Sequence, residues 1–258
     1  MKRAHFRFYA ELNDFLPPDK RSVSFAYPFQ GDQTVKHLIE SAGVPHTEVD
    51  LILVNGESVD FAYRVGDGDH VSVYPMFEAF DVSRTSRVRP QPLRRTRFVL
   101  DTHLGRLAAY LRLLGFDALY RSDFPDDELA RISAGEHRIL LTRDRGLLKR
   151  SQVTHGYYVR ETGSRAQLLE VLRRFDLSRS VSPFERCLRC NERLEAVPKA
   201  DVFHRIPPRS RDLYDEFRQC PGCGRLYWPG SHYRRMRAFI DQVVKQALQL
   251  LPPPPENC

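Results

Sequence analysis

The sequence predicts an α/β protein built from an N-terminal β-grasp domain, an α/β domain with a parallel sheet, and a small cysteine-bearing region. Three observations carry this prediction. The first 77 residues follow the order strand, strand, helix, strand, strand. From Arg97 onward, short apolar runs alternate with amphipathic helical stretches, which is the pattern of parallel strands joined by crossover helices. Beyond Pro183, two C-x-x-C pairs replace that alternation.

The elements of the β-grasp domain follow from local patterns. Residues 4–10 and 23–27 alternate between apolar and polar side chains, as strands do. Residues 34–43 begin with a Thr and end with a Gly, which are typical start and stop residues of a short helix. Residues 50–61 contain an Asn-Gly pair between two apolar runs, a strong hairpin signal. Residues 66–77 give a turn and a final strand.

The α/β part begins with a short buried strand that ends in Asp101. We expect Thr102 to cap the following helix, whose apolar stripe starts at Leu104 and which Gly115 terminates. The acids that open the next helix suit the positive end of its dipole. The remaining elements are expected as strands over residues 116–120, 137–142 and 156–160, a short helix or turn over 143–150, and helices over 126–134, 164–175 and 232–251.

Charge is distributed unevenly along the chain. Residues 1–82 hold 7 Lys and Arg against 13 Asp and Glu, whereas the remainder holds 33 against 20. Almost all cations of the second part are Arg, whose planar fork suits phosphate oxygens. This bias favours RNA or another nucleic acid as partner, although an Arg-rich composition alone would also produce it. Residues 83–97 contain six Arg and two Pro, as expected of a basic linker; an extended arm that contacts phosphates is the alternative.

The sequence shows no pattern typical of membrane insertion or secretion. No apolar run approaches the roughly 18 residues that a membrane span needs, so we expect no membrane association. The N-terminus lacks an apolar block before its first acid, so we expect no signal peptide and a cytoplasmic protein.

The shifts in pattern and charge predict the domain boundaries. The predicted parts are a β-grasp domain over 1–82, a basic linker over 83–96, an α/β domain over 97–180, a cysteine-bearing region over 181–240 and a helical or disordered tail over 241–258.

Several acidic residues fall where an α/β sheet places its ligands. Asp101 ends one predicted strand and Asp144 follows another, while Asp126, Asp127 and Glu128 open the helix between them. Such acids repel one another unless a divalent cation neutralises them, and oxygen ligands suit Mg²⁺ or Mn²⁺. Metal ions held in this way activate water in phosphodiester hydrolysis. Alternatively, Asp101 caps a helix and the other acids serve a helix dipole.

Two arginines flank the last of these acids. Arg143 and Arg145 could clamp a scissile phosphate or pair with nearby acids, and the sequence does not separate the two interpretations.

Four cysteines form the pattern of a structural zinc site. Cys187 and Cys190 make one C-x-x-C pair, and Cys220 and Cys223 make the other, 29 residues further on. Each pair resembles a rubredoxin-like knuckle, and the Pro and Gly of the second pair suit the tight turn. Four thiolates complete a tetrahedral shell, so the predicted role is structural. A pair of redox disulfides is the alternative. Cys258 is expected to be inert.

Combined, these segments resemble the Mut-seven C-terminal RNase domain family, a PIN-like nuclease with an appended zinc ribbon. The resemblance rests on residues 98–120, 126–130, 138–148 and 219–236 and covers about 97–240. Residues 7–17, 35–56 and 66–78 resemble the ubiquitin-like domain often fused ahead of that family, which is itself similar to small sulfur carriers. The domain departs from the carriers because its final strand leads into YPMFEAFD without a Gly-Gly terminus. A docking or regulatory role with a protein partner fits better than sulfur transfer.

The resemblance implies a metal-dependent ribonuclease. Asp101, Asp127 and Asp144 would hold Mg²⁺ or Mn²⁺, with Asp126 and Glu128 as alternatives at the middle position, and Arg143 or Arg145 would stabilise phosphate charge. Two other functions stay open: a non-catalytic RNA-binding module that uses the zinc ribbon and the Arg-rich surface, and a protein-interaction adaptor.

Overall fold

The computed structural model describes residues 1–75, 86–88 and 96–249. Most of the predicted basic linker, and the tail from residue 250 onward with Cys258, lie outside the described residues. The chain divides into two compact units. One unit combines Met1–Arg95 with Asp126–Tyr158, and the other combines Thr96–Pro125 with Val159–Cys258.

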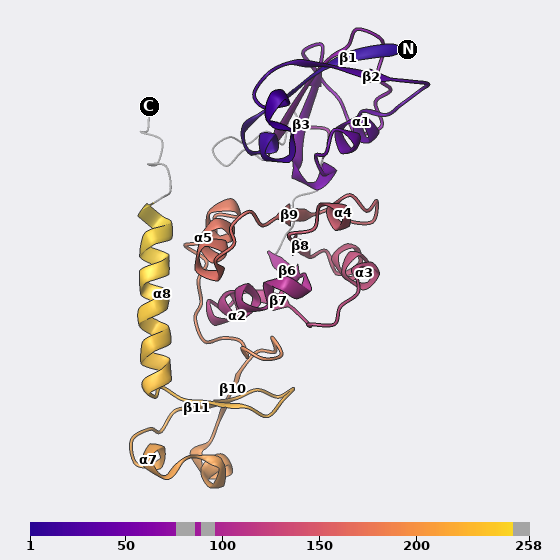
Figure 1. The fold of residues 1–258 in the computed structure, drawn as a ribbon. Coiled ribbons are helices and arrows are strands. Elements are labelled where there is room, and N and C mark those ends of the chain that lie inside the picture. Colours follow the sequence, from indigo (N-terminus) through magenta and orange to yellow (C-terminus); the bar gives the residue numbers. More distant parts are fainter. Residues whose placement is uncertain (76–85, 89–95, 250–258) are drawn as a thin grey trace. The chain divides into compact units, whose positions relative to one another are not determined.

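The N-terminal part of the first unit is a mixed sheet with one helix (Figure 1). Its described elements are β1 (Lys2–Phe8), η1 (Ala10–Phe15), η2 (Pro18–Lys20), β2 (Phe25–Phe29), α1 (Val35–Ser41), η3 (His46–Glu48), β3 (Val49–Val54), β4 (Glu57–Ser58) and β5 (His70–Pro75). The strand order is β2-β1-β5-β3-β4. β1 is parallel to β5, and the pairs β1–β2, β3–β5 and β3–β4 are antiparallel. This arrangement confirms the predicted β-grasp fold.

Local sequence signals explain these elements. The Thr34 side chain accepts a hydrogen bond from the His37 N–H and so caps α1, as predicted. Asn55 and Gly56 both have positive φ angles, 52° and 91°, as a two-residue hairpin turn between β3 and β4 requires. Alternate residues of the central strands are buried together with the apolar side of α1, and this burial supplies the main stabilisation of the sheet.

The second part of the first unit follows a strand–helix pattern. Its elements are α3 (Asp126–Glu136), β8 (Ile139–Thr142), α4 (Arg145–Leu148) and β9 (Gly156–Tyr158). β8 and β9 are parallel. A strand was predicted here, and all four residues of β8 are buried, as is typical of strands in a parallel sheet.

The second unit begins with the same kind of pattern. Its first elements are β6 (Arg97–Leu100), η4 (Thr102–Leu104), α2 (Gly105–Leu113), β7 (Asp117–Leu119) and, further along the chain, α5 (Ser164–Arg174). β6 and β7 are parallel, and α2 packs against α5. Together with β8 and β9, these strands confirm the predicted parallel pairing. The predicted Thr102 cap is wrong, because the Thr102 hydroxyl donates to the Asp101 carboxylate instead, at 3.0 Å.

The cysteine-bearing part of this unit is a small antiparallel sheet with short helices. It contains β10 (Glu195–Val197), α6 (Lys199–Val202), η5 (Phe203–Arg205), α7 (Pro208–Arg211), β11 (Phe217–Gln219) and β12 (Leu226–Tyr227). The strand order is β10-β11-β12. Val202, Ile206 and Phe217 form a separate small core, with Trp228 packed against it. Three buried apolar side chains give little stability, so this part needs an additional constraint.

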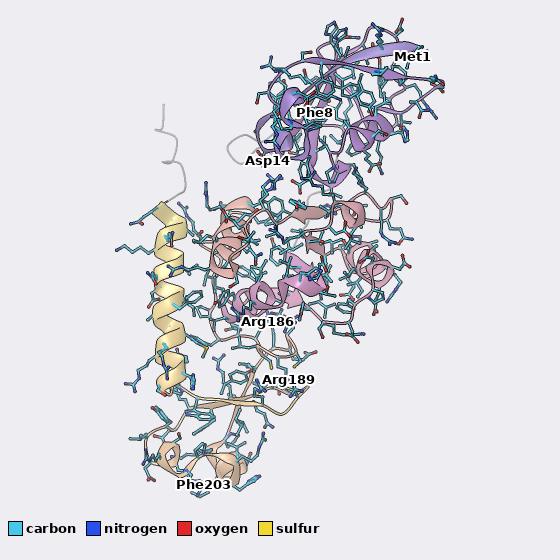
Figure 2. All side chains as sticks on the ribbon, in the orientation of Figure 1. Met1, Phe8, Asp14, Arg186, Arg189 and Phe203 are labelled. Atoms are coloured by element: carbon cyan, nitrogen blue, oxygen red, sulfur yellow. The ribbon has the colours of Figure 1, made fainter. Side chains whose placement is uncertain are left out.

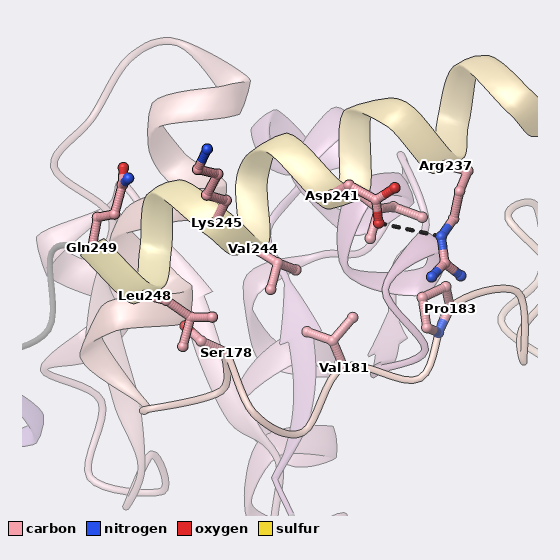
Figure 3. A pocket seen from close by; sticks show the side chains of 10 residues that line it. Ser178, Val181, Pro183, Arg237, Asp241, Val244, Lys245, Leu248 and Gln249 are labelled. Carbon is pink, nitrogen blue, oxygen red and sulfur yellow. Dashed lines mark ion pairs between the residues drawn. The ribbon is translucent and has the colours of Figure 1, made fainter.

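The described chain ends with a long amphipathic helix, α8 (Ser231–Gln249), as predicted. Ile240, Val243 and Ala247 are buried, and α8 contacts α5. Beside the buried stripe, Val244 faces Val181 across a pocket that Leu248 and Ser178 also line, next to an Arg237–Asp241 ion pair at 3.2 Å (Figure 3). Within the described residues, none of the helices combines the length and apolar composition that crossing a bilayer requires.

Candidate functional site

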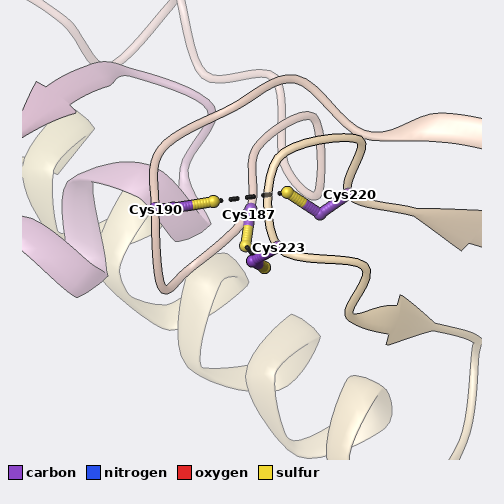
Figure 4. A group of neighbouring side chains, drawn as sticks. All are labelled: Cys187, Cys190, Cys220 and Cys223. Carbon is purple, nitrogen blue, oxygen red and sulfur yellow. Dashed lines mark hydrogen bonds between the residues drawn. The ribbon is translucent and has the colours of Figure 1, made fainter.

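The four cysteines come from two tight turns, one preceding β10 and one between β11 and β12 (Figure 4). The Sγ atoms of Cys187 and Cys223 lie 3.6 Å apart, and those of Cys190 and Cys220 lie 3.3 Å apart. All four sulfurs lie within 4.8 Å of one another. The cysteines are free thiols, so the structure does not contain the alternative pair of disulfides.

The two turns share one backbone geometry. In each turn the carbonyl of the first cysteine accepts from the N–H four residues on: Asn191 to Cys187 at 3.0 Å, and Gly224 to Cys220 at 2.8 Å. Asn191 and Gly224 have φ angles of 72° and 70°. The left-handed region favours Gly, and Asn is one of the few other residues that adopt it readily. The residue after each C-x-x-C pair therefore lets the chain reverse and bring two sulfurs together.

Ionisation of the cluster is uneven. Burial raises the pKa of Cys187, but hydrogen bonds from the Tyr227 hydroxyl and from the N–H groups of Cys190 and Arg189 bring it down to about 6. Burial and a hydrogen bond with Cys220 raise the pKa of Cys190 to about 12. Four thiolates this close repel one another, so full ionisation requires a cation among them.

The donor set fits a structural metal such as zinc. A Zn–S length of about 2.3 Å in a tetrahedron places the sulfurs about 3.8 Å apart, close to the separations in this cluster. Four sulfur ligands leave no open coordination position for a substrate, so the cluster would stabilise the fold without taking part in a reaction.

A network of buried polar side chains ties the first cysteine turn to the α/β part of the unit. The Arg112 guanidinium donates to the carbonyls of Ala118, Leu188 and Arg189 at 2.8, 3.1 and 2.8 Å. The Asn191 amide accepts from the Ala118 N–H at 2.9 Å and donates to Asp117 at 2.7 Å.

A second arginine strengthens the same junction. Arg186 pairs with Asp117 at 3.3 Å and donates to the Asn191 carbonyl at 2.8 Å. In the sequence, Arg186 directly precedes Cys187 and Arg189 directly precedes Cys190, and both arginines are labelled in Figure 2. The cysteine turn and the β7 region are therefore joined by several hydrogen bonds and an ion pair.

These contacts were not predicted from the sequence. Arg112 lies in the middle of a predicted helix, where an arginine is expected to be exposed, yet it is only 3% exposed in the structure. Burial lowers its pKa, while the nearby cysteines and Asp117 oppose that shift. A cation in this position also suits a thiolate cluster with a net negative charge. Only the Asn that directly follows Cys190 could have signalled a special turn.

The predicted acidic residues belong to different units. Asp101 lies in the second unit, at the end of β6, and is 7% exposed. It occupies the position that precedes η4, but its side chain makes no capping hydrogen bond there. The structural alternative for Asp101, a helix cap, is therefore not realised.

The middle acids lie in the first unit, in the opening turn of α3. Asp127 forms an ion pair with Arg150, which also lies 3.8 Å from Asp126. Glu128 lies 3.9 Å from Arg131. Asp127, Arg131 and Arg150 line a small open pocket with Ser151 and Gln152. Arg150 was not among the predicted site residues, although its basic side chain follows the Arg143–Arg145 pair closely in sequence.

Asp144 lies in the first unit as well and caps α4. Its Oδ1 accepts from the N–H groups of Gly146 and Leu147, at 2.6 and 3.4 Å. Arg143 is half-buried at the end of β8. The Arg145 guanidinium donates to the backbone carbonyls of Asp14 and Phe15, both at 3.3 Å. Asp144 therefore has a structural role, and the two arginines have different surroundings.

Comparison with known families identifies both parts of the chain. The family described as Mut7-C RNAse domain matches residues 96–240, more than half of the chain. The chain belongs to this family. The family described as Mut7-C ubiquitin matches residues 1–81, which confirms the resemblance of the N-terminal domain. The comparison with curated proteins and the comparison with solved structures gave no match.

The Mut7-C RNAse match encloses both cysteine pairs and all predicted acidic residues. It ends within α8, nine residues before that helix ends. The match supports a ribonuclease-type function for residues 96–240, and the ubiquitin-like match suggests protein interaction for residues 1–81.

Proposed function

We propose that this chain is a metal-dependent ribonuclease that hydrolyses RNA phosphodiester bonds. The observation that carries the proposal is the Mut7-C RNAse domain match over residues 96–240. The positions of the acids support it. Asp101 directly follows strand β6, and Asp144 lies two residues after strand β8. Asp127 lies in the first turn of α3. Ligands bind beyond the carboxyl ends of such strands.

In this proposal Asp101, Asp127 and Asp144 hold Mg²⁺ or Mn²⁺, with Asp126 and Glu128 as neighbouring carboxylates. A bound divalent ion would supply an activated water and charge neutralisation at the phosphate. The carboxylates fix the position of the site, and Arg143 stabilises charge on the scissile phosphate. Arg145 is less suited to that role because two backbone carbonyls already accept from its guanidinium.

The other parts of the chain have supporting roles in the proposal. The four-cysteine cluster holds Zn²⁺ and stabilises the zinc ribbon, whose apolar core is small. The basic second part binds the RNA backbone. The ubiquitin-like domain binds a protein partner.

The test compares Asp101→Asn and Asp144→Asn with Asp32→Asn, an exposed carboxylate of the ubiquitin-like domain that serves as the matched control. We expect the full-length protein to cleave labelled RNA with Mn²⁺ and not with EDTA. Each of the two site variants should lose at least about 100-fold in rate, because the metal binds weakly and activates its water poorly. The control should keep the parental rate.

Three results would reject the proposal. Cleavage that persists in EDTA would exclude metal dependence. RNA binding without cleavage under any metal would favour the non-catalytic RNA-binding module. Absence of both binding and cleavage would favour the protein-interaction adaptor.

A further inference from the structure

The residue after Asp144 is held by the ubiquitin-like domain. Arg145 opens α4, and its Nη1 and Nη2 atoms donate to the carbonyls of Phe15 and Asp14 at the end of η1, whose Asp14 is labelled in Figure 2. Its guanidinium also lies 5.0 Å from the centroid of the Phe15 ring and 5.4 Å from that of Tyr158. The two rings meet edge to face at 5.4 Å. Although Arg145 is an exposed residue, its guanidinium therefore contacts two aromatic rings and donates to two backbone carbonyls.

The other end of α4 is attached to the same domain. Lys149, the residue that follows α4, donates through Nζ to the carbonyl of Glu40 at 2.6 Å. The ring of His46 lies between the Glu40 carboxylate at 2.7 Å and the Val153 carbonyl at 2.9 Å.

A buried carboxylate completes the attachment at β9. The Tyr158 N–H donates to Glu48, which is fully buried. Buried hydrogen bonds to charged groups have a specific geometry and are costly to leave unmade. The start of α4, its end and the strand that follows are therefore each bonded to the ubiquitin-like domain.

We propose that Arg145 is a positioning residue and that the ubiquitin-like domain is the scaffold that holds the Asp144 turn in its shape. The Asp144 carboxylate takes its orientation from the N–H groups of Gly146 and Leu147. α4 has only four residues, too few to be stable by itself. Because Arg145 anchors its first turn, these two N–H groups stay directed at Asp144. The consequence for catalysis rests on the proposed ribonuclease function, whereas the consequence for the turn does not.

The experiment uses the full chain and measures hydrogen exchange at the Gly146 and Leu147 amides beside RNA cleavage. Arg145→Ala removes both hydrogen bonds and the ring contact. We expect exchange at the two amides at least tenfold faster, and a fall of about tenfold in kcat with little change in KM, because a carboxylate is misplaced while RNA binding remains. Arg64→Ala, an exposed arginine of the same domain, is the control and should change neither measurement.

A second variant covers the case in which Arg145→Ala does not fold. Phe15→Leu keeps an apolar side chain in a buried position and removes the aromatic face beneath the guanidinium. We expect a change of the same sign and smaller size at the two amides. Exchange that remains at the parental rate in both variants would overturn the proposal.

The exchange measurement separates this proposal from the proposed function. If the parent protein cleaves no RNA, the ribonuclease proposal fails, and faster exchange in Arg145→Ala still supports the scaffold. If Arg145→Ala loses cleavage while exchange at Gly146 and Leu147 is unchanged, Arg145 acts on the RNA phosphate directly, and the scaffold proposal is wrong.

Discussion

The four-cysteine cluster and the acidic residues are both ligand sets, but the chain constructs them differently. Each cysteine pair lies within one turn, so backbone hydrogen bonds between residues that are close in the sequence bring its two sulfurs together. The acids Asp101, Asp127 and Asp144 are spread over three elements and two compact units. All three also have other partners, which are the Thr102 hydroxyl for Asp101, Arg150 for Asp127 and the α4 backbone for Asp144.

The comparison shows that the cysteine cluster, whose pairs form locally, indicates a metal site by its geometry alone, whereas acids that are far apart in the sequence do not. The thiols have a geometry that few ligands other than a metal would satisfy. A carboxylate serves as well in a helix cap or an ion pair as in a metal site. The following predictions test that difference, from the largest expected effect to the smallest.

Removing one thiol should have the largest effect. Cys220→Ser should lower bound zinc well below one equivalent and unfold the region around β10–β12, because the binding free energy of a structural zinc, about 10 kcal/mol or more, is folding free energy. Metal analysis and thermal unfolding measure both effects. Cys258→Ser, which removes a thiol outside the cluster, is the control. A full equivalent of zinc in Cys220→Ser would contradict the four-cysteine site.

Removing the buried arginine beside the cluster should have the next largest effect. Arg112→Met keeps much of the side-chain volume but removes the donor to four backbone carbonyls, those of Ala118, Tyr120, Leu188 and Arg189. We expect a loss of about 3 kcal/mol in the free energy of unfolding and about tenfold weaker zinc binding. Denaturant unfolding and competition with a zinc chelator measure these changes. Arg189→Met, at an exposed position of the same turn, should change neither by more than a small amount.

The capping role of Asp144 can be separated from its proposed catalytic role. Asp144→Ala removes the acceptor for the Gly146 and Leu147 N–H groups and should cost about 1 kcal/mol of stability. Asp144→Asn retains an acceptor oxygen and should cost only a few tenths of that amount. If Asp144 is a metal ligand, the same variant should also bind Mn²⁺ more weakly. If Asp144→Asn and the parent protein cleave RNA at equal rates, Asp144 caps α4 but takes no part in catalysis.

The smallest effect on stability is expected at Arg150. Its ion pair with Asp127 involves a carboxylate that is 87% exposed, so Arg150→Ala should change the free energy of unfolding by less than about 1 kcal/mol. If Asp127 is a metal ligand, the same variant should bind Mn²⁺ more tightly, because a competing cation is removed. Calorimetric titration with Mn²⁺ measures this, with Arg121→Ala, which pairs with Asp123, as the control. Unchanged affinity would favour Asp126 or Glu128 as the middle ligand.

The sequence by itself determined the features that depend on short-range patterns. Alternation and the Asn55-Gly56 turn predicted the β-grasp strands, and C-x-x-C spacing predicted the cysteine cluster. These signals are reliable because their geometry is set within a few residues. Thr102 shows their limit: a residue suited to capping bonded instead to the neighbouring Asp101, since a hydroxyl has more than one partner in reach.

Only the tertiary structure decided which long-range partners each polar side chain has. It buried Arg112 against the first cysteine turn, placed residues 126–158 in one compact unit with the ubiquitin-like domain, and turned Arg145 toward the carbonyls of Asp14 and Phe15. The sequence shows that an arginine is charged, but it does not show which residues will lie next to that arginine in the folded protein. Which acceptor a guanidinium binds depends on the packing of elements that can lie more than 100 residues apart in the sequence, as for Arg145. Where the guanidinium is buried, as in Arg112, leaving its hydrogen bonds unmade would be costly, and this cost makes the choice of acceptors specific.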